Sequence, residues 1–77
     1  SPITRTVGRW RGLLAMLSDP LEIQTRRNAV WTLYNLAAVR CSVGATEECA
    51  ALASLAAEFA PEDESVGILL ERAQHAP

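Results

Sequence analysis

The chain has 77 residues, about half of them apolar, which is enough for one small domain. No apolar run approaches the roughly 18 residues of a membrane span, and the first residues, SPITRTVGRWRG, lack the apolar core of a signal peptide. A chain this short buries only about 60% of the surface that its unfolded form exposes, so we expect a partner, a second copy or neighbouring segments to contribute to its stability.

The net charge of −2 conceals an uneven distribution of charge along the chain. Residues 1–42 carry six arginines against two acids, a net charge of +4, whereas residues 43–77 carry one arginine against seven acids, a net charge of −6. Two solvated helix faces would explain this division. The alternative is that the basic half meets an acidic partner or the acidic half of another copy.

The N-terminal half is predicted to form two helices. Ser1 can cap the first helix and Pro2 suits its first position, while the pair Asp19-Pro20 ends it and starts the second. We expect the apolar stripe of the first helix to pack inward, and a second face of small residues on the same helix to meet another helix closely. The stripe is Ile3, Val7, Trp10, Leu14 and Leu17, and the small face is Gly8, Gly12 and Ala15.

The second helix is predicted to run to about Ser42, with Gly44 as its stop. It has two apolar faces, so it is either central or packed on one side and open to a ligand on the other. The face expected in the core holds Val30, Leu33, Leu36 and Ala37, and the other holds Ile23, Arg27, Trp31, Tyr34, Ala38 and Cys41.

The C-terminal half is predicted to form two further helices. Thr46 is the expected cap of the third, which ends at Ala60-Pro61, and the fourth begins within the acidic stretch PEDES and frays near Gln74. Their expected inner faces are Cys49, Leu52, Ala53, Ala56 and Phe59 in the third helix and Val66, Leu69, Leu70 and Ala73 in the fourth. The fold class is therefore all-α, with about four antiparallel helices in a single small domain, residues 1–77.

Residues 30–63 resemble a tetratricopeptide repeat, a helix–turn–helix unit of about 34 residues. The first helix of that family has a large apolar residue, then a leucine three positions later, then a small residue, and Leu33, Leu36 and Ala37 match this pattern. The stretch YNLA, residues 34–37, also resembles the family consensus. Turn, small and closing residues then follow at steps of seven, five, seven and five: Gly44, Cys49, Ala56 and Pro61. The resemblance implies that residues 1–20 are the second half of an earlier repeat and that the chain is a fragment of a longer repeat protein.

The chain also departs from that pattern. Arg40 replaces a large tyrosine, Ala53 replaces a large aromatic residue, and roughly two extra turns of helix lie between Pro20 and Val30. The long stretch LEIQTRRNAVWTLYNLA is also similar to a helix of an armadillo or HEAT unit, and a plain four-helix domain of no family is a third interpretation.

We find no chemistry that would make the chain an enzyme, and we predict no cofactor and no metal. His75 is the one histidine, and with two cysteines it gives no zinc-module spacing. We interpret Cys41 and Cys49 as reduced, buried small residues, and therefore expect a cytoplasmic protein. A secreted protein with one disulfide is the alternative.

The resemblance implies a protein–protein interaction module, such as an adaptor or scaffold, whose first helices line a groove for a peptide or helix of a partner. The partner-binding residues carried over from it are Trp31, Tyr34, Ala38 and Cys41, with Arg27 one turn earlier. An aromatic pair beside an arginine is a common interface anchor, and the arginine favours an acidic or amphipathic partner segment. The alternative is that the first or fourth helix covers the pair.

The charge distribution is compatible with two other functions. A homo-oligomer could form by pairing the basic half of one copy with the acidic half of another, and such head-to-tail contacts form open chains or closed rings. A nucleic-acid binder could use Arg5, Arg9, Arg26 and Arg27, but the sequence pI of about 5.2 argues against it.

Overall fold

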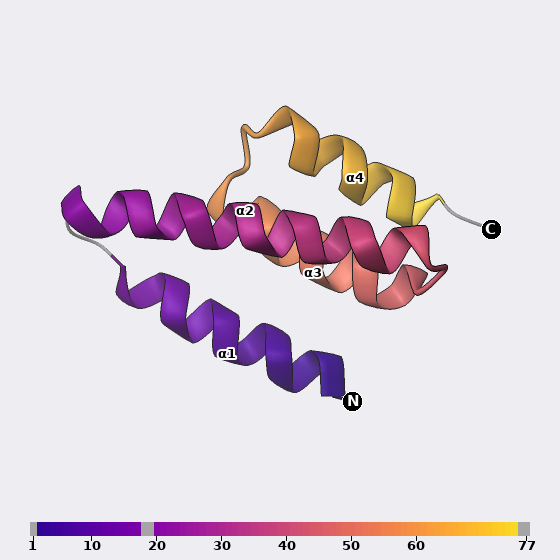
Figure 1. Ribbon diagram of the computed structural model, residues 1–77, viewed down its shortest axis with the longest axis horizontal. Helices are drawn as coiled ribbons and strands as arrows, with labels where there is room; N and C mark the ends of the chain where they lie inside the picture. Colours follow the sequence, from indigo (N-terminus) through magenta and orange to yellow (C-terminus); the bar gives the residue numbers. More distant parts are fainter. Residues whose placement is uncertain (1, 18–19, 76–77) are drawn as a thin grey trace.

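The computed structural model describes residues 2–17 and 20–75, and every element in these ranges is a helix. The helices are α1 (Pro2–Met16), α2 (Pro20–Ser42), α3 (Thr46–Phe59) and α4 (Glu64–Gln74). Figure 1 shows consecutive helices running in opposite directions, with α1 on one side of the α2–α3 pair and α4 on the other. The all-α, four-helix prediction is confirmed for the described residues.

The helix ends largely follow the expected breaks. Gly44 forms the turn between α2 and α3 with φ of 83°, a left-handed conformation that glycine adopts without strain. The Asp63 side chain accepts a hydrogen bond from the Val66 N–H at 3.0 Å and so caps α4. Thr46 was wrongly predicted as a cap, because Ala45 holds that position and the Thr46 hydroxyl instead donates to the Gly44 carbonyl at 3.3 Å. The expected caps Ser1 and Asp19 lie outside the described residues.

The central helix is α3, which packs against all three others. Its alanines and leucines let neighbours approach from several sides, so it supplies the largest share of the buried core among the described residues. Twelve buried residues form one hydrophobic cluster: Leu14, Val30, Leu33, Ala37, Cys49, Leu52, Ala53, Leu55, Ala56, Val66, Leu69 and Ala73. The small residues expected at the α2–α3 contact, Ala37, Cys49 and Ala56, are fully buried there.

One predicted face is wrong and another is wrong at one residue, because Val30, Leu33 and Ala37 of the predicted core face of α2 are buried but Leu36 is not. Gly8, Gly12 and Ala15 are exposed, and nothing lies within 4 Å of a Cβ added at either glycine, so no helix approaches that face. Leu36, expected in the core, is 41% exposed. In both cases the reason is that α1 lies against α3 through its other stripe, which leaves the small face of α1 and the Leu36 side of α2 uncovered.

Two exposed ion pairs tie outer helices to α3. Arg11 Nη2 lies 2.8 Å from Glu58 Oε2 and connects α1 to α3, and Arg40 Nε lies 3.3 Å from Glu48 Oε2 and connects α2 to α3. All four side chains are about half exposed, so each pair contributes about 1 kcal/mol or less to stability. Helix position therefore depends mainly on the apolar contacts.

Candidate partner-binding pocket

An open pocket lies where the N-terminal half of α2 meets the turn between α3 and α4. Its volume is about 370 Å³, near the lower end of the range for ligand pockets. The turn after Pro61 brings the start of α4 back toward α2, with which α4 is in contact. The lining residues are Arg27, Val30, Trp31, Tyr34, Phe59, Ala60, Glu62, Asp63 and Val66.

The aromatic pair on α2 is the main feature of this pocket. The Trp31 and Tyr34 rings are stacked, with centroids 5.1 Å apart and planes 13° from parallel. Their spacing of three places both on one side of a helix, and Tyr34 is half-buried against the core while Trp31 is 57% exposed. A tryptophan that is held by a neighbouring ring but remains accessible is a rigid contact for a partner.

The five residues expected to bind a partner do not all meet here. Arg27, Trp31 and Tyr34 line the pocket together. Ala38 does not line it and is half-buried against the core. Cys41 lies farther along α2, near its C-terminal end, where it is bonded to Cys49.

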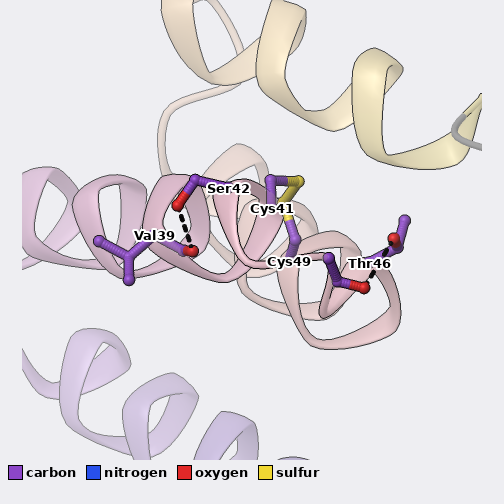
Figure 2. The surroundings of a disulfide bond; sticks show 6 residues. Val39, Cys41, Ser42, Thr46 and Cys49 are labelled. Atoms are coloured by element: carbon purple, nitrogen blue, oxygen red, sulfur yellow. Dashed lines mark hydrogen bonds between the residues drawn. A yellow bond between two sulfur atoms is a disulfide. The ribbon is translucent and has the colours of Figure 1, made fainter.

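The disulfide corrects the interpretation of both cysteines as reduced thiols. The sharp turn after Ser42 brings the last turn of α2 beside the first turn of α3, and the Cα atoms of Cys41 and Cys49 lie 5.2 Å apart, within the range that a disulfide needs. Figure 2 shows the bond joining the two helices next to the turn. It fastens the end of the hairpin opposite the pocket, which lies toward the N-terminal part of α2.

Sequence reasoning missed the acidic side of the pocket. Glu62 and Asp63 line it from the α3–α4 turn, whereas the sequence pattern predicts a role for these acids only at the start of the fourth helix. That assignment is correct for Asp63, which caps α4. The sequence signal for a second role is Glu62, which precedes α4 and its cap, but only the fold shows that Glu62 lines the same pocket as Trp31.

A second hollow, of about 430 Å³, lies between the N-terminal part of α1 and the α2–α3 pair. It includes the uncovered Leu36, but α2 and α3 already pair Arg40 with Glu48 there, and no aromatic side chain lines it. Within the described ranges, no group of three or more potential metal ligands is found, and no helix has the length and apolarity to cross a membrane.

Comparison of the chain with protein-family models, with curated proteins and with solved structures finds no match.

Proposed function

We propose that this chain is a non-enzymatic protein–protein interaction module that holds a peptide or helix of a partner in the pocket at Trp31 and Tyr34. The observation that carries the proposal is the stacked aromatic pair, with Trp31 57% exposed at the edge of an open pocket. A core that needed this ring would have enclosed it, as it encloses Leu33, which lies two residues later on another face of the same helix.

The proposed architecture is tetratricopeptide-like, with α2 and α3 as the two helices of one unit and α4 as the first helix of the next. In that family the first helices of successive units line the groove, and here the pocket lies between α2 and the start of α4. Burial of Ala37, Cys49 and Ala56 supports this view. The 23-residue length of α2 instead favours the armadillo- or HEAT-like alternative.

The proposed partner is an acidic or amphipathic segment of another protein. Arg27 is exposed at the pocket and has no ion-pair partner among the described residues, so it can receive a carboxylate. The apolar part of the segment would cover the Trp31 ring. Because acids line the same pocket, a segment with both apolar and charged residues fits better than a purely acidic one.

The proposal is tested by selecting binders from a displayed library of helix-forming peptides against the immobilised chain. We expect selected peptides to bind the parent protein and to lose at least tenfold in affinity for Trp31→Ala, since a central aromatic anchor contributes about 2 kcal/mol or more. Leu36→Ala, which shortens an exposed apolar residue on another face, is the matched control and should leave affinity unchanged. Peptides that bind both variants as well as the parent would place the interaction elsewhere and refute the proposal.

Self-association is the second candidate function, and the uneven charge favours it. Arg5 and Arg9 of α1 are exposed and form no ion pair among the described residues, while Glu62 and Glu64 are exposed beyond α3. Light scattering at low and high salt distinguishes the two candidates. A charge-paired assembly dissociates as salt rises, whereas a module that acts as a monomer keeps the same mass.

The cytoplasmic location remains a prediction, and the disulfide removes its main reason. Structural disulfides persist mainly in oxidising compartments, so the bond between Cys41 and Cys49 favours a location outside the reducing cytoplasm. Alkylating free thiols in intact cells before mass spectrometry decides the matter. Alkylated Cys41 and Cys49 would restore the cytoplasmic interpretation.

A further inference from the structure

The pocket brings together two kinds of group that attract a cation. The face of an aromatic ring carries partial negative charge, and tryptophan binds cations better than any other side chain ring. Trp31 lies beside Tyr34 and is more than half exposed, and the acidic residues Glu62 and Asp63 line the same pocket from the α3–α4 turn. A cation in the pocket is therefore attracted by the ring and by the two acids.

The two carboxylates are not neutralised within the described part of the chain. Glu62 and Asp63 form no ion pair there, although Arg27 lines the same pocket. Asp63 is held in place because its Oδ1 accepts the Val66 N–H at 3.0 Å, which fixes one acid of the turn without removing its charge. The three charged residues of the pocket sum to a net charge of −1, so a positive ligand is favoured over a negative one.

The ring of Trp31 is also unoccupied by a cation of this chain. Arg27 lies one helical turn before it, the spacing at which such a contact forms on a helix, yet the stack with Tyr34 is the one ring contact of Trp31 in the described ranges. The pocket volume of about 370 Å³ suits one long side chain rather than a whole folded element.

We propose that the pocket binds an arginine side chain carried by the partner segment, with the guanidinium lying over Trp31 and facing Glu62 and Asp63. This inference rests on the proposed function and specifies the partner's chemistry. Arginine is preferred over lysine because its planar guanidinium stacks on an aromatic ring and also donates to carboxylates. Arg27, at the α2 side, then receives an acid next to that arginine in the segment, which makes the segment amphipathic rather than purely acidic.

The test uses a probe with no contribution from the rest of a peptide: N-acetyl-argininamide, titrated into the ¹⁵N-labelled chain and followed by NMR. We expect saturable shifts of the Trp31 indole N–H and of the Glu62 and Asp63 amides. The indole N–H of Trp10, on α1, is an internal control and should stay in place. N-acetyl-citrullinamide has nearly the same shape without the charge and should produce far smaller shifts.

Three variants separate a charge effect from a shape effect. Glu62→Gln combined with Asp63→Asn keeps the size of both side chains, and asparagine still caps α4, so the fold should persist while probe affinity falls by about two- to fivefold for each charge removed. Glu64→Gln removes a neighbouring acid that does not line the pocket and should leave affinity nearly unchanged. Arg27→Gln should raise probe affinity, because it removes a like charge.

Each other result overturns the inference in a distinguishable way. If the argininamide shifts do not saturate at Trp31, or if the citrulline analogue shifts it equally, the arginine assignment is wrong. If N-acetyl-glutamate binds instead and Arg27→Gln abolishes it, the partner is acidic; the proposed interaction module then stands and the inference fails. If pocket signals move with protein concentration alone, the occupant is a second copy. The peptide selection with Trp31→Ala judges the proposed function independently of all these results.

Discussion

Reduction of the disulfide is expected to lower the free energy of unfolding by an amount that depends on the length of the loop that the bond closes. Cys41 and Cys49 are separated by 8 residues, so the bond closes a short loop in the unfolded chain. In the chain-entropy description the unfolded state loses about 8 cal/mol/K for a loop of this length, which corresponds to about 2.5 kcal/mol at room temperature. Reduction restores that entropy to the unfolded state and hence destabilises the fold.

Packing in the folded state should change little on reduction. The measured loss of stability therefore reports mainly the entropy of the unfolded chain. Cys49 is fully buried and a reduced thiol behaves there as a small apolar group, so the cluster around it keeps its volume. For a domain of this size about 2.5 kcal/mol corresponds to a fall in Tm of about 10–20 °C.

The assay is urea unfolding followed by helical circular dichroism, with and without a phosphine reductant, after mass spectrometry has established the thiol state. The variant Cys41→Ala/Cys49→Ala is the control, because reductant should leave its unfolding curve unchanged. Equal stability of the oxidised and reduced parent protein would refute the entropic reasoning. Free thiols in the protein before reductant is added would show that the bond itself does not form.

Three further sets of substitutions probe the core, the pocket and α1. Ala56→Leu overpacks a fully buried site and should lower the free energy of unfolding by about 1–3 kcal/mol, whereas Ser54→Leu on the exposed side of α3 should not; an unchanged Tm for Ala56→Leu contradicts the tight contact. Tyr34→Ala removes a half-buried ring and should lower the free energy of unfolding by about 2 kcal/mol, and Trp31→Ala should lower it by less. A loss of about 3 kcal/mol or more at Tyr34, which is typical of emptied aromatic core sites, would mean that this side of α2 is core. The double variant Gly8→Ala/Gly12→Ala should raise thermal stability, measured by the same dichroism signal.

Local signals account for the part of the fold that the sequence predicted. These signals are a proline close to an acidic cap, a turn glycine, and apolar residues at steps of three and four. Each depends on only a few neighbouring residues, and together they place all four helices with only small errors at the ends. The error at Thr46 is of this small kind, since a threonine just inside a helix and a threonine capping it differ by one position.

Tertiary relations account for what the sequence did not predict. A stripe of small residues indicates only that a close helix contact is possible. Which face of α1 is covered depends on how α1 packs against α3, and in this fold Gly8 and Gly12 lie on the uncovered face. The disulfide was missed for the same reason, because Cys41 and Cys49 meet only once the turn at Gly44 has reversed the chain. For the pocket, the aromatic side was predicted from one helix, whereas Glu62 joins it from another element.

The glycine double variant tests whether the outward face of α1 is free or is covered by a second copy. Gly8 and Gly12 are helical, have no positive φ and have nothing within 4 Å of an added Cβ, so alanine at each costs no contact and removes a residue that disfavours helix by about 0.8–1 kcal/mol. Part of that gain reaches the global stability, because Leu14 on the other face ties α1 to the core. We therefore expect Gly8→Ala/Gly12→Ala to raise the free energy of unfolding by about 1–2 kcal/mol. If the parent protein instead buried these glycines against a second copy, the same change would lower the stability and the oligomer mass together. A rise in stability without a change of mass would exclude a self-contact through this face of α1 and would leave the pocket at Trp31 as the proposed binding surface.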